Sequence, residues 1–127
     1  MPPSRWLILL GSITMFCGGV LHTIGYTFFI PALVRNNIPA DLLGAVKAVW
    51  LVFSVELALL SVAIAWVSRL PGTRSFVLFL VLIPVCDSVL MYHFVGLFIG
   101  FYVVAASAVL VAVGSWLLPR PARQSEG

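Results

Sequence analysis

Four apolar segments occupy most of this chain, and they constrain its fold more than any other feature of the sequence. Each is long enough for a helix that crosses a hydrocarbon layer of about 30 Å, which takes about 20 residues. Within a helix the backbone groups bond to one another, so none is left unsatisfied in lipid. The sequence therefore predicts an all-α integral membrane protein, a four-transmembrane-helix up-down-up-down bundle. We expect a single membrane domain over residues 1–127, with helices at about 6–30, 43–67, 76–94 and 97–118.

The composition excludes a soluble domain and a nucleic-acid partner. Of the 127 residues, 62% are apolar and 9% are charged, which is too little polar surface to cover a soluble fold. The formal net charge of +3 does not come from a basic helix or an aromatic-basic surface that would follow a phosphate backbone. We expect the lipid bilayer to surround the chain.

The basic residues predict how the chain is oriented. The first apolar segment is too long for a signal peptide and lacks a small-residue cleavage site, so we interpret it as a retained helix. Positive charge concentrates in cytoplasmic loops. Fewer basic residues fall in the first loop, and the arginines of the opposite side are Arg5, Arg69, Arg74, Arg120 and Arg123. We therefore predict a multi-pass protein of the inner or plasma membrane with both termini cytoplasmic.

Three ionisable side chains lie inside separate apolar segments: His22, Glu56 and Asp87. At a helical rise of about 1.5 Å per residue, His22 and Asp87 lie roughly 12 Å and 11 Å below the outer ends of their helices, and Glu56 roughly 16 Å. Carboxyls within a membrane pair, neutralise or line a water-accessible site. We expect the three groups to surround one pocket in the outer half of the bundle. The alternative is a hydrogen-bond network between helices that fixes the bundle.

Neighbouring residues favour a pocket at this depth. Pro84, three residues before Asp87, removes a backbone donor and opens the helix beside the carboxyl group. Small side chains on one helical face leave space beside the imidazole, since the following residues recur with His22 at intervals of three and four: Gly11, Thr14, Gly18 and Gly25.

Three further side chains are candidates for ligand binding. Tyr26 lies one turn beyond His22, Trp50 is placed as a lid or an interfacial anchor, and His93 falls near the outer rim. We predict no metal, because no Cys/His cluster has the spacing of a zinc site. His22 and His93 differ in depth by about 10 Å, too much to hold one haem iron, so we predict no cofactor.

Small residues in the last segment predict close helix packing. Gly96 and Gly100 have the small-xxx-small spacing, and Ser107 and Gly114 continue it at seven-residue steps. This face either packs within the bundle or forms a homodimer or a larger membrane complex. The sequence leaves both alternatives open.

Two short motifs, the LH of Leu21-His22 and the VEL of Val55 to Leu57, resemble the sterol isomerase and sigma-2 receptor superfamily. The resemblance implies a membrane bundle with acidic residues and a hydrophobic ligand cavity. It covers these few residues, and Asp87 has no counterpart in it. The small multidrug-resistance transporters also have four short helices, but their essential glutamate lies in helix one, where this chain carries His22 and no acid.

The polar pocket predicts a function as well as a site. A carboxyl and an imidazole at one substrate make a general acid and base. We expect a pocket for a small hydrophobic molecule and, in an enzyme, an isomerase, epoxide hydrolase or cyclase of a lipid-like substrate, with His22, Glu56 and Asp87 catalytic. Tyr26 and Trp50 would orient the substrate. The alternatives are an oligomeric proton-coupled transporter and an accessory subunit of a membrane complex.

Overall fold

The structure, a computed structural model, describes residues 2–119 and folds them into four helices. All four are long and apolar enough to cross a membrane. The all-helical class and the four candidate spans are thus confirmed, and they are those of a multi-pass membrane protein. The helices are α1 (Pro3–Arg35), α2 (Ala40–Val67), α3 (Arg74–Val95) and α4 (Ile99–Trp116).

The first helix extends beyond the predicted residue 30 because a proline does not stop it. Pro31 lies inside α1, which ends only at Arg35. The end is set by two asparagines. The Asn36 side chain donates to the Ala32 carbonyl at 2.9 Å, and Asn37 adopts a left-handed conformation with φ 55°. Asparagine tolerates this conformation better than most residues, so the chain turns here into α2.

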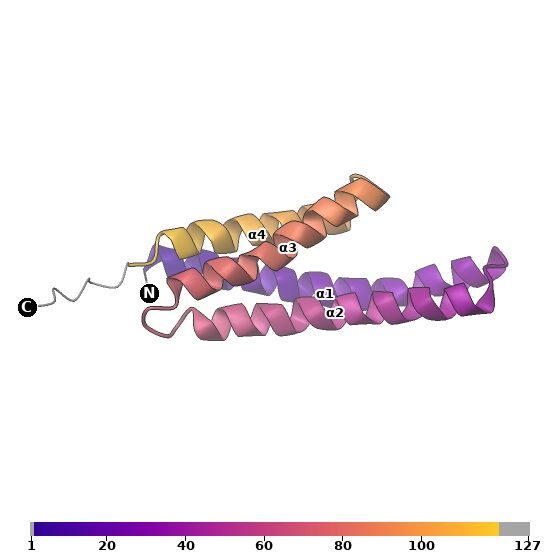
Figure 1. Cartoon of the computed structure of the whole chain (residues 1–127), viewed down its shortest axis with the longest axis horizontal. Coiled ribbons are helices and arrows are strands. Elements are labelled where there is room, and N and C mark those ends of the chain that lie inside the picture. The colour runs from indigo at the N-terminus through magenta and orange to yellow at the C-terminus, as the bar shows by residue number, and fades with distance from the viewer. Residues whose placement is uncertain (1, 120–127) are drawn as a thin grey trace, which may run out of the picture.

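The four helices form two hairpins of unequal length (Figure 1). The long α1–α2 hairpin and the shorter α3–α4 hairpin lie together at the end that holds the α2–α3 turn, and they diverge toward the other end. Helix α1 packs along both α2 and α4, and α3 packs on α4, whereas α2 and α3 barely touch.

We call the end that holds the α2–α3 turn the closed end. There, glycines bring the backbones of α1 and α4 nearly into contact. A Cβ atom on Gly11 would lie 2.9 Å from the Ser107 carbonyl oxygen, and one on Gly114 would lie 2.7 Å from the Ser4 carbonyl oxygen. Such close approach is typical of small residues in membrane helices. Ser107 and Gly114 are both buried, so at these two positions the stripe packs within the bundle.

The other half of the predicted small-residue stripe does not form. Gly96 follows the last residue of α3 with φ 85°, and Phe98 is extended, so α4 begins at Ile99 rather than at residue 97. Gly100 is covered by its own neighbours, because a Cβ there would lie 2.5 Å from the Phe98 ring. Gly96 and Gly100 therefore lie on different elements, and a homodimer or larger complex through them stays a prediction.

Candidate functional site

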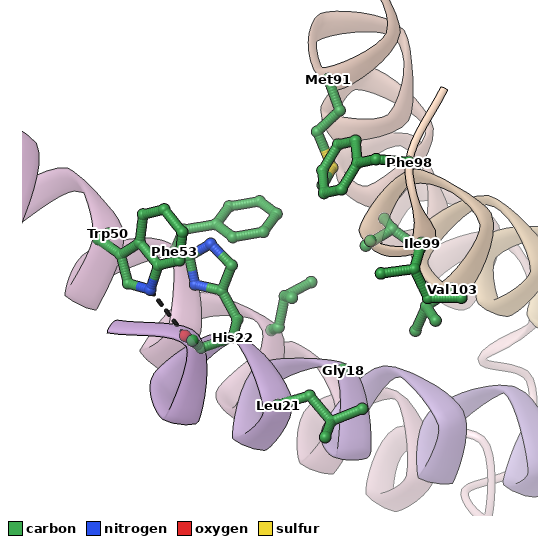
Figure 2. Close-up of a pocket in the computed structure, with 13 residues that line it drawn as sticks. Gly18, Leu21, His22, Trp50, Phe53, Met91, Phe98, Ile99 and Val103 are labelled. Carbon is green, nitrogen blue, oxygen red and sulfur yellow. Dashed lines mark hydrogen bonds between the residues drawn. The ribbon is translucent and has the colours of Figure 1, made fainter. Parts of the chain in front are cut away.

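An apolar cavity of about 210 Å³ lies between the two hairpins. His22, Trp50 and Phe53 lie on one side of it, and Met91, Phe98, Ile99 and Val103 face them from the other hairpin (Figure 2). An apolar cavity of about 150 Å³ in another protein holds benzene, so the space accepts a molecule of at least one ring. All four helices contribute to the lining.

The cavity opens to the surface of the molecule. Leu21 and Ile99, which line it from α1 and α4, are 61% and 77% exposed. Deeper in the cavity, Leu57 and Val104 are buried, and Gly18 allows α1 and α4 to approach, since a Cβ there would lie 2.9 Å from Val103 Cγ1. The cavity therefore has a closed floor and an open rim.

His22 is held by a serine of the neighbouring helix. Its Nδ1 lies 2.9 Å from Ser54 Oγ, and this hydroxyl also lies 3.1 Å from the Trp50 carbonyl oxygen. Gly19 allows α1 and α2 to approach closely enough for this contact, because a Cβ at that position would lie 2.9 Å from the Ser54 carbonyl oxygen. The Nε2 atom remains accessible and has no hydrogen-bond partner among the described residues.

Aromatic rings fix the plane of the imidazole. Trp50 stacks on His22 with the ring centroids 4.2 Å apart and the planes 16° apart, and Phe53 meets the imidazole edge-on at 5.0 Å. The Trp50 indole also donates to the His22 carbonyl at 2.7 Å, and the Phe29 ring stacks on the indole with the centroids 4.5 Å apart. The Trp50 indole therefore holds both the side chain and the backbone of His22.

The structure does not bring the two carboxyl groups into this cavity. Glu56 lies beside an open apolar groove on α2, and neither carboxyl is part of the cavity lining. Asp87 precedes the lining residue Met91 by about one helical turn. Its Oδ2 is buried without a hydrogen-bond partner among the described residues. The two carboxyls therefore belong to α2 and α3, the helices that barely touch.

Tyr26 and His93 also lie outside the cavity lining. Tyr26 is half-buried on α1 one turn beyond His22, and His93 is exposed near the end of α3, where its ring meets Phe94 edge-on at 4.8 Å. Of the predicted site residues, the structure brings together His22 and Trp50. Within residues 2–119, no three His, Cys, Asp or Glu side chains are grouped as metal ligands.

Several residues that build this site are not among those predicted from the sequence. Ser54 had a usable signal, because a position four residues after Trp50 lies on the same helical face. Phe53, three residues after Trp50 on the same helix, also meets the His22 imidazole. Phe98 and Ile99 gave no signal, since their positions depend on the turn at Gly96.

Comparison of the chain with protein-family models, with curated proteins and with solved structures gives no match. The fold and the site by themselves define, over residues 2–119, a four-helix protein with four candidate membrane spans and an apolar cavity between two hairpins.

Proposed function

We propose that this multi-pass membrane protein binds a small hydrophobic molecule in the cavity between its hairpins. The observation that carries the proposal is the cavity itself, which is lined by apolar and aromatic side chains around one hydrogen-bonding imidazole. Binding pockets typically combine an apolar lining with a few placed polar groups. The rings stacked on His22 support the proposal, because they preorganise the imidazole before any molecule enters.

We propose ligand binding and not the conversion of a substrate by His22, Glu56 and Asp87 together. Acid/base catalysis needs each group within hydrogen-bond reach of the substrate, directly or through one water. His22 lines the cavity, whereas Glu56 and Asp87 do not. We therefore propose binding, and the isomerase, hydrolase or cyclase chemistry expected from the sequence stays a prediction.

Filling the cavity is expected to abolish binding. The change Val103→Phe adds a ring at a lining position that faces the cavity (Figure 2). We expect saturable uptake of tritiated methylnaphthalene by the protein in lipid nanodiscs, after subtraction of empty discs. The variant should bind at least about 10-fold more weakly, a loss of about 1.4 kcal/mol. Equilibrium dialysis measures both affinities.

Matched variants locate the binding. Val113→Phe makes the same change at an exposed position of α4 away from the cavity, so its affinity should equal that of the parent protein. Glu56→Gln and Asp87→Asn should also bind within about twofold of it, because these carboxyls lie outside the cavity. Absence of saturable uptake by the parent protein would contradict the proposal. A large loss of affinity in Asp87→Asn would show that this carboxyl takes part in binding.

We also propose that the helices cross the membrane up and down with both termini in the cytoplasm. Arg5 lines one hollow at the closed end with Arg74 and another with Arg69, and the Arg74 guanidinium lies 4.7 Å above the Trp116 ring. This clustering of positive charge supports a cytoplasmic closed end. Arg120 and Arg123, which were predicted to add to it, lie outside the described residues.

Reporter fusions test this orientation. A green fluorescent protein at the C-terminus should fluoresce, and alkaline phosphatase at the same place should be inactive. Insertion of each reporter after Asn37, in the α1–α2 turn, should give the opposite pair of results. Active phosphatase at the C-terminus would reverse the proposed orientation.

A further inference from the structure

The Ser54 hydroxyl determines which nitrogen of the neutral His22 ring carries the proton. A hydroxyl has one proton to donate, and a carbonyl oxygen can only accept. Ser54 Oγ lies within hydrogen-bond distance of both the Trp50 carbonyl oxygen and His22 Nδ1. Both contacts are hydrogen bonds only when Ser54 donates to Trp50 and His22 donates from Nδ1–H to Ser54. Serines in helices commonly donate to the carbonyl four residues earlier.

The remaining ring nitrogen is then a pure acceptor on a side chain that lines the cavity. Nε2 carries a lone pair and no proton, and it has no partner among the described residues. The ring cannot easily rotate to find one, since Trp50 stacks on its face and Phe53 meets its edge. In apolar surroundings an unpaired acceptor costs free energy, and a donor that enters with an apolar body recovers it.

We infer that the cavity takes a hydrophobic molecule that carries an O–H or N–H donor, such as a hydrophobic alcohol or phenol, and that this donor bonds to His22 Nε2. The inference rests on the proposed function and specifies the chemical class of the ligand. An ether or a hydrocarbon of the same shape lacks the donor and leaves Nε2 unpaired. The cavity volume of about 210 Å³ is large enough for such a molecule if it has one ring or two fused rings.

Three naphthalenes substituted at one ring position test the inference on the unaltered protein in nanodiscs. Naphthol carries the donor, methylnaphthalene has nearly the same shape without it, and methoxynaphthalene keeps an oxygen acceptor but has no donor. We expect naphthol to bind about 10-fold more tightly than either of the others, after correction for partition into empty discs. In Ser54→Ala, which releases Nδ1, and in His22→Phe, which removes Nε2, this preference should fall toward onefold.

The probes separate failure of the inference from failure of the proposed function. Equal affinities that are all lost in Val103→Phe would overturn the donor requirement and leave the binding function standing. Methoxynaphthalene binding as tightly as naphthol, with methylnaphthalene weaker, would show that His22 donates and would overturn the proton assignment. Absence of saturable binding for all three would overturn both proposals.

The proton can also be observed without changing the site. The chain has two histidines, so His93→Gln leaves His22 as the only imidazole. Nitrogen NMR of the histidine-labelled variant in nanodiscs should show a protonated Nδ1 and an unprotonated Nε2, and the Nε2 signal should shift when naphthol is added. A protonated Nε2 in the ligand-free protein would overturn the assignment.

Discussion

Replacing Gly114 with valine is expected to separate α4 from α1 and to cause a large loss of stability. A Cβ at this position would lie 2.7 Å from both the Ser4 carbonyl oxygen and Ile8 Cγ1, and 2.9 Å from the Ile8 backbone nitrogen. Two of these atoms belong to the α1 backbone, so the clash is relieved only by moving a helix. Overpacking of a core costs about 1–3 kcal/mol, and we expect the upper end of this range.

Gly44→Val is the matched control for this change. Gly44 also lies within a helix, but a Cβ there would meet no atom within 4 Å. Both variants share the effect of a β-branched side chain on helix propensity. Thermal unfolding in detergent, followed by fluorescence-detected size exclusion, should show a much lower midpoint for Gly114→Val. Equal midpoints for the two variants would contradict the close α1–α4 contact.

Trp50→Ala is expected to be the most damaging change at the site. The indole stacks on both His22 and Phe29 and donates to the His22 carbonyl, so its removal leaves two rings and one acceptor without their partner. Truncation of a packed tryptophan in soluble proteins costs about 3–5 kcal/mol. Trp50→Phe keeps a stacking ring and loses only the hydrogen bond, so about 1 kcal/mol is expected.

Unfolding in mixed micelles with increasing dodecyl sulfate measures these costs. Trp66→Ala provides the comparison, because Trp66 lies on the same helix with 67% of its surface exposed. Its stability should stay close to that of the parent protein. A loss in Trp66→Ala as large as that in Trp50→Ala would show that the cost comes from lipid or detergent contact, not from the aromatic stack.

The helices were predictable because apolar length alone determines them. A run of about 20 apolar residues has few other stable states in lipid, and all four runs are helices in the structure. The predicted helix ends were less accurate where a turn depends on the conformation of one residue. Asn37 and Gly96 adopt positive φ values that neither apolar length nor periodicity reports.

The candidate site was only partly predictable. The sequence gives the depth of a side chain along its helix, but it does not give the direction in which the side chain points. His22, Glu56 and Asp87 were aligned by helical rise, which fixes depth. Each step along a helix also turns the side chain by about 100°, and the packing of the helices decides which face meets a cavity. The divergence of the hairpins gives that space to His22 and Trp50 and leaves the carboxyls beside it.

The exposed rim at Leu21 and Ile99 has a consequence for how a molecule arrives. If the helices cross the membrane as proposed and this rim lies within the hydrocarbon layer, a ligand of the proposed kind would enter sideways from the bilayer rather than from bulk water. Occupancy then follows the mole fraction of the compound dissolved in lipid. Two compounds with equal contacts in the cavity would differ in apparent aqueous affinity by the ratio of their partition coefficients.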